Sequence, residues 1–117
     1  MIEMLWDYHT HTIFSRRNHG KGTIEENVKA GLRKGLQEIA ISDHGPGHLV
    51  YGMKRSSIEE MRREIQALQE RFPEIKIHLS VEANIINRSG ALDVTKEEQG
   101  RFDFIMAGYH YGAFGEN

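Results

Sequence analysis

The sequence contains no cysteine and only two prolines in 117 residues. The lack of cysteine excludes disulfide bonds, thiolate zinc sites and a cysteine nucleophile together. No apolar run approaches the roughly 18 residues of a membrane-spanning helix. The N-terminus carries Glu3 and Asp7 where a signal peptide would carry basic residues. We therefore expect a cytoplasmic protein without a membrane partner.

The charge balance has no large excess of either sign. Lys and Arg total 15 and Asp and Glu total 17, which gives a formal net charge of −2. Nucleic acid is therefore not an expected partner, because its binding surfaces are usually strongly basic. Hydrophobic residues make up 38% and charged residues 27%, as in globular proteins. The length is that of a single domain.

Two segments have the periodicity of amphipathic helices. Thr23 begins an S/T-x-x-E capping box, and apolar residues at helical spacing predict a helix over 24–35. A second apolar stripe predicts a helix over 57–72, with Ser56 or Ser57 as its N-cap. The proline that follows marks its end.

Between and around these helices, short apolar or alternating segments predict strands. They lie at residues 4–8, 38–42, 75–86 and 102–108. A turn at 87–90 and a short helix within 95–100 connect the last two strands. Strands that alternate with helices predict βαβ units and a parallel sheet, so the fold class is α/β with right-handed crossovers.

Metal-binding side chains stand at the carboxyl ends of these predicted strands. The set is His9 and His11 on the first strand, His44 on the second, Glu82 on the third and His110 on the fourth. Active sites of parallel α/β folds lie at this edge of the sheet. Residue parity also places Ala40, Ser42 and His44 on one face and the intervening isoleucines on the face toward the helices. We therefore expect the strand-end side chains to meet.

The chemistry of this set points to metal ions. A lone buried carboxylate such as Glu82 needs a partner, and a cation supplies one. Imidazole and carboxylate without sulfur suit Zn, Fe or Mn, and there are more ligands than one tetrahedral ion requires. A multinuclear site fits phosphoester hydrolysis, in which the ions activate water and hold phosphate oxygens.

The remaining polar residues have less specific surroundings. His19 lies in a polar loop, where a ligand and a surface residue are equally good interpretations. We interpret His48 as a loop histidine and His78 as a hydrogen-bonded residue of the barrel floor or surface. Asp43 is expected to orient His44 as a hydrogen-bond acceptor.

Four motifs together resemble the PHP (polymerase and histidinol phosphatase) domain superfamily, and most closely its stand-alone bacterial phosphoesterases. In chain order they are His9-Thr10-His11, Ser42-Asp43-His44-Gly45, Glu82-Ala83-Asn84-Ile85 and Gly108-Tyr109-His110. The resemblance covers the whole chain. His19 stands where that branch has a further histidine ligand, which favours the ligand interpretation.

The resemblance implies a distorted (βα)7, TIM-like barrel with helices on its outer face and a site for two or three divalent ions, Zn, Mn or Fe. His9, His11 and Glu82 would bind one ion. Glu82 would bridge to a second ion with His110, and His19 and His44 would bind the third. The implied activity is hydrolysis of a small phosphomonoester, with Glu82 and His110 as the catalytic residues.

The chain is shorter than such a barrel, which needs about 200 residues or more. Residues 1–117 are therefore expected to form a single partial domain, with further ligands beyond Asn117. We favour a fragment of a longer protein over a natural half-barrel completed by another copy or a truncated inactive product. An open edge strand favours self-association.

Two other functions remain open from the sequence. The domain could be a non-catalytic or proofreading module of a DNA polymerase, or a metal-binding fragment without turnover. The residues beyond position 117 would distinguish the enzyme from the polymerase module.

Overall fold

The computed structural model describes residues 6–15, 22–48 and 51–109. His19 and His110 lie outside the described residues, so their expected roles stay predictions. The elements, in chain order, are β1 (Trp6–Thr10), α1 (Ile24–Arg33), β2 (Glu38–His44), α2 (Ser57–Arg71), β3 (Lys76–Asn84), α3 (Lys96–Gln99) and β4 (Met106–Gly108).

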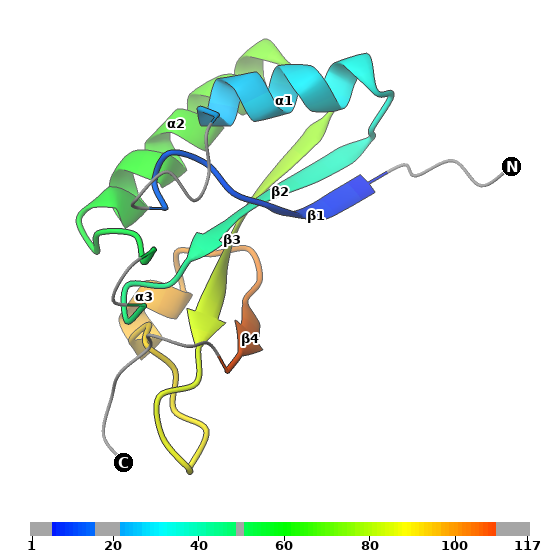
Figure 1. Ribbon diagram of the computed structural model, residues 1–117. Helices are drawn as coiled ribbons and strands as arrows, with labels where there is room; N and C mark the ends of the chain where they lie inside the picture. Colours follow the sequence, from blue (N-terminus) through cyan, green and yellow to red (C-terminus); the bar gives the residue numbers. More distant parts are fainter. Residues whose placement is uncertain (1–5, 16–21, 49–50, 110–117) are drawn as a thin grey trace, which may run out of the picture.

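The four strands form one parallel sheet in the order β1-β2-β3-β4. The sheet curls into half of a barrel, and α1 and α2 lie side by side on its outer face (Figure 1). Helix α1 packs against β2 and helix α2 against β3. The predicted α/β class and parallel pairing are therefore confirmed, with helices on the outer face.

Each face of the central strands carries a different kind of side chain. Ile39 and Ile41 of β2 are buried in the hydrophobic core with the apolar stripes of both helices. The opposite, concave face carries small and polar residues, namely Ala40, Ser42, His44, His78, Ser80 and Glu82. The predicted parity is confirmed, and it directs the polar residues of β2 and β3 into the interior of the half-barrel.

Helix α1 begins with the predicted capping box. The Thr23 hydroxyl accepts a hydrogen bond from the Glu26 N–H at 3.1 Å, and the Glu26 carboxylate accepts one from the Thr23 N–H at 3.2 Å. At the other end Lys34 is the C-cap, and Gly35 follows with φ +77°. Only glycine adopts this left-handed conformation readily, so it ends the helix.

Helix α2 begins at the predicted residue, Ser57, but without a side-chain cap. Ser56 is its N-cap, but its side chain makes no capping hydrogen bond to the first turn because Ser56 has helical backbone angles, φ −63° and ψ −18°. A capping serine needs an extended backbone to turn its hydroxyl toward the following N–H groups.

The two helix starts provide a matched pair of variants. Thr23→Ala removes a formed cap and is expected to lower the free energy of unfolding by about 1 kcal/mol. Ser56→Ala removes a hydroxyl that caps nothing in the first turn, and is expected to change it by less than about 0.5 kcal/mol. Urea unfolding followed by circular dichroism measures both. Equal losses in the two variants would contradict the assigned caps.

Strand β4 is shorter than the predicted strand over 102–108. The Asp103 carboxylate accepts the Leu79 N–H at 2.7 Å, and the Asp103 N–H donates to the Leu79 carbonyl at 2.7 Å. A side chain thus takes a position that a strand backbone would otherwise fill, and regular pairing with β3 starts at Met106. By contrast, β2 extends two residues beyond the predicted 38–42, so His44 is its last residue.

Within the described residues, no helix combines the length and the apolar character that crossing a membrane requires.

Candidate metal centre

Strand β1 contains an irregularity where it approaches the site. Asp7 pairs with Ile39 and Thr10 pairs with Ile41, so β1 has one residue more than β2 over this interval. Such a bulge bends a strand and redirects its side chains. The Asp7 carboxylate supports it by accepting the His9 N–H at 3.0 Å. The Nε2 atoms of His9 and His11 lie 3.2 Å apart, so both rings face one point as predicted.

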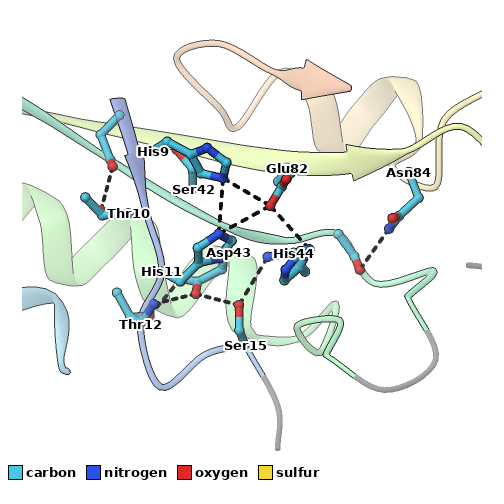
Figure 2. A network of polar contacts seen from close by, with 12 residues as sticks. His9, Thr10, His11, Thr12, Ser15, Ser42, Asp43, His44, Glu82 and Asn84 are labelled. Atoms are coloured by element: carbon cyan, nitrogen blue, oxygen red, sulfur yellow. Dashed lines mark hydrogen bonds and ion pairs between the residues drawn. The ribbon is translucent and has the colours of Figure 1, made fainter. Parts of the chain in front are cut away.

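Glu82 lies at the carboxyl end of β3, directly beside His44 in the parallel register. Its Oε2 atom is 3.2 Å from His9 Nε2 and 3.3 Å from His11 Nε2. The same oxygen is 3.3 Å from His44 Nδ1 (Figure 2). Three strands thus bring three imidazoles to a single carboxylate oxygen.

The spacing of these atoms fits metal ligands. In a tetrahedral zinc site with Zn–N bonds of about 2.0–2.1 Å, neighbouring ligand atoms lie about 3.3 Å apart. Charge-assisted hydrogen bonds between nitrogen and carboxylate are shorter, about 2.7–2.9 Å. All three contacts to Glu82 are 3.2–3.3 Å, and one ligand atom from each of His9, His11 and Glu82 falls within 4.8 Å of the others. The donor set therefore fits a divalent ion.

Two opposing effects act on the pKa of the Glu82 carboxyl. Burial raises the pKa of its carboxyl, but the hydrogen bond with His9 and the charges of His44, His9 and His11 outweigh burial. The pKa of Glu82 consequently lies below its ordinary value. An anionic carboxylate is the form that binds cations.

Asp43 differs from its expected role. Its carboxylate accepts hydrogen bonds from Thr12 and Ser15, and the described bonds of Asp43 do not include the His44 ring. The reason is geometric, because neighbouring residues of a strand point to opposite faces. Asp43 therefore faces away from the cluster that contains His44.

Asp93 is a site-supporting residue that the sequence interpretation missed. Its buried carboxylate accepts the Gly47 N–H at 2.8 Å, the Asn84 N–H at 2.9 Å and the Asn84 side-chain amide at 2.5 Å. It thereby joins the loop after β2 to the end of β3. A Cβ added at Gly45 would lie 2.5 Å from Asp93 Oδ2, so this glycine allows the close approach. No local sequence pattern marks the contact, since its partners are 9 and 46 residues away.

His48 lies in the loop after β2, as interpreted from the sequence, but it is nearer the cluster than that interpretation implied. It is 5% exposed, and its ring centroid is 5.2 Å from that of His44. Its Nδ1 accepts the Tyr51 N–H at 3.0 Å, and the Tyr51 ring stacks on it.

His78 lies near the amino end of β3, at the opposite end of the strand from the cluster around Glu82. Its Nε2 is 3.0 Å from Glu38 Oε1, and its ring packs edge-on against Tyr8 and Phe104. The prediction of a hydrogen-bonded barrel-floor residue is confirmed.

The Glu38–His78 pair makes an acid-stability prediction. The hydrogen bond with His78 lowers the pKa of Glu38, burial opposes this, and a bond with Tyr8 adds to the lowering. Because the pKa of Glu38 is lower in the folded than in the unfolded protein, its ionised form stabilises the fold at pH values above the unfolded pKa. That stabilisation is lost as the pH falls through the pKa of the folded protein. Glu38→Gln should therefore flatten the fall in Tm between about pH 5 and pH 3. Glu70→Gln, on an exposed part of α2, is the control. Equal acid sensitivity of Glu38→Gln and the unsubstituted protein would contradict the pairing.

Comparison with known proteins places this fold and cluster in a family. The sequence pattern of the PHP domain matches residues 7–117. This span includes β2, β3, β4 and all of β1 except Trp6, together with the residues around Glu82. The chain belongs to the PHP domain family.

Its relatives include named phosphatases. A probable phosphatase of Acetivibrio thermocellus is 36% identical over 109 residues, covering 93% of this chain and 42% of that protein. A probable phosphatase of Caldanaerobacter subterraneus is 32% identical over 117 residues, covering 97% of this chain and 42% of that protein. The chain spans less than half the length of these curated relatives.

A solved structure with the same fold is that of histidinol phosphate phosphatase from Lactococcus lactis, in complex with zinc, L-histidinol and phosphate. The TM-score is 0.62 with 26% sequence identity, covering 90% of this chain and 40% of that one. The half-barrel thus corresponds to part of a larger PHP barrel.

Proposed function

We propose that the chain is the N-terminal part of a metal-dependent phosphoesterase that hydrolyses a small phosphomonoester. The observation that carries this proposal is the convergence of three imidazoles on Glu82 Oε2 at the carboxyl edge of a parallel sheet. The names of the relatives, and the zinc and phosphate in the similar structure, support it. Residues 1–117 are then a single partial domain.

The described ligands would serve more than one ion. His9 and His11 would hold one ion with Glu82, and His44 would hold another. His19 and His110 would complete the set, and the ions would number two or three. Zn, Mn and Fe all suit imidazole and carboxylate ligands.

Bound divalent ions would supply an activated water and positive charge for the phosphate oxygens. The residues of the chain would orient these groups. Glu82 would offset the charge of the bound cations, and the rings of His11 and His44 stack beside it with centroids 4.6 Å apart. Glu82 and His110 are the proposed catalytic residues.

Metal analysis combined with an activity assay tests this proposal. The protein, in the longest form that its source produces, is purified, loaded with Zn or Mn and assayed with p-nitrophenyl phosphate. We expect at least one tightly bound ion per chain and metal-dependent release of phosphate. Metal binding without turnover of any phosphomonoester would favour a non-catalytic or polymerase-associated module. Failure to bind any divalent ion would refute the proposal.

A further inference from the structure

We propose that Asp43 is a positioning residue that sets the distance between His11 and His44 by holding residues 12–15 against β2. The inference deepens the proposed function and rests on it. It concerns a residue that contacts neither a ligand nor a substrate.

Asp43 has three short hydrogen bonds in a fully buried environment. Its side chain is 0% exposed, and Thr12 and Ser15 are 0% and 1% exposed. Asp43 Oδ1 accepts the Thr12 N–H at 2.6 Å and the Ser15 hydroxyl at 2.7 Å, and Oδ2 accepts the Thr12 hydroxyl at 2.7 Å. Hydrogen bonds to a charged acceptor in a low-dielectric interior are among the strongest in proteins.

Two of the residues joined by these hydrogen bonds are adjacent in the chain to candidate metal ligands. Thr12 directly follows His11, and Asp43 directly precedes His44. The Ser15 hydroxyl also accepts the His44 N–H at 3.2 Å. The residues next to His11 and His44 in the chain are therefore hydrogen-bonded to one another. The two imidazole rings themselves have centroids 4.6 Å apart (Figure 2).

Before His11, the Thr10 hydroxyl ties the chain to β2 by donating to the Ala40 carbonyl at 2.7 Å. The parallel register of β1 with β2 shifts between Asp7 and Thr10, and its last registered pair is Thr10 with Ile41. The His11 carbonyl accepts a hydrogen bond from the Asn27 side chain at 3.4 Å, a long distance for this type of bond. Beyond Thr10, the strongest described connection between the chain around His11 and β2 is thus the Asp43 carboxylate.

The test uses Asp43→Asn in the longest natural form of the protein. The amide keeps the shape of the carboxylate but is uncharged and replaces one acceptor oxygen by a donor. The charge-assisted bonds are therefore weakened, and a hydroxyl can bond the amide nitrogen only by turning to accept. We expect Zn affinity to fall by about tenfold or more, as when the supporting partners of metal ligands are removed. The absorption spectrum of bound Co²⁺, which reports ligand geometry, should also change.

Two further variants separate positioning from general stability. Thr12→Ser keeps the hydroxyl and N–H donors, so it should retain the Zn affinity and Co²⁺ spectrum of the unsubstituted chain. Asp103→Asn also removes a carboxylate that accepts a strand N–H, that of Leu79, but lies away from the cluster. It should lower Tm while leaving Zn affinity and the Co²⁺ spectrum unchanged.

The possible outcomes are distinct. If Asp43→Asn lowers Tm but leaves Zn affinity and the Co²⁺ spectrum unchanged, the residue is structural only and the inference is wrong. If the unsubstituted protein, in its longest natural form, binds neither Zn nor Co²⁺, the proposed function fails and the inference falls with it. Should Asp43→Asn not fold, Ser15→Ala removes one bond to the carboxylate together with the bond from the His44 N–H, and the same two measurements apply to it.

Discussion

Glu82→Gln is expected to remove metal binding and nearly all phosphatase activity from the protein in its longest natural form. Glutamine keeps the shape of the side chain but lacks the negative charge that faces three imidazoles. Losing several kcal/mol of charge stabilisation corresponds to a fall in activity of at least about a hundredfold. Metal content by elemental analysis and turnover of a phosphomonoester measure the two effects separately.

The matched control is His78→Gln. His78 lies on the same face of β3 as Glu82 but is four residues earlier, at the opposite end of the half-barrel, and it bonds Glu38. It should leave turnover almost unchanged. A Glu82→Gln protein that kept its metal and its activity, or a His78→Gln protein as inactive as Glu82→Gln, would show that the essential ligands have been misplaced.

The 117-residue chain alone is expected to bind metal more weakly than its longer relatives, with little or no phosphatase turnover. Four parallel strands leave the half-barrel open, with β1 and β4 at its edges. The relatives are more than twice as long, since the chain covers 42% of each. Ligands from the remainder of such a barrel would complete the coordination of the ions.

A direct comparison checks this expectation. The 117-residue chain and the Acetivibrio thermocellus relative are loaded with the same metal and assayed with the same phosphomonoester. Equal rates for the two proteins would show that the second part of the barrel supplies no essential ligand. Activity that rises more steeply than protein concentration would show that a second copy of the chain completes the site.

The sequence predicts the arrangement of the site because that arrangement follows from simple periodicities. Alternating parity in β2 and β3 places His44 and Glu82 on one face, and parallel pairing brings their strand ends together. The capping box at Thr23 is equally local, since its partners are three residues apart. In both cases the spacing within one segment determines the contact.

Contacts between segments that are distant in the sequence cannot be predicted from the spacing within one segment. The bulge in β1 depends on pairing with β2 and has no pattern of its own. Asp43 and Asp93 hold residues 31 and 46 positions away, and their chemistry alone would equally fit a ligand or a surface charge. The short β4 likewise depends on one bond between Asp103 and Leu79, which only the folded chain reveals.

The most direct test of the account is crystallographic location of zinc by anomalous scattering in the unsubstituted protein in its longest natural form. The account predicts a zinc peak about 2.0–2.1 Å from His9 Nε2 and His11 Nε2, with Glu82 Oε2 as a further ligand. A peak coordinated by His48 or His78 in place of these residues, or no zinc within bonding distance of Glu82, would contradict it.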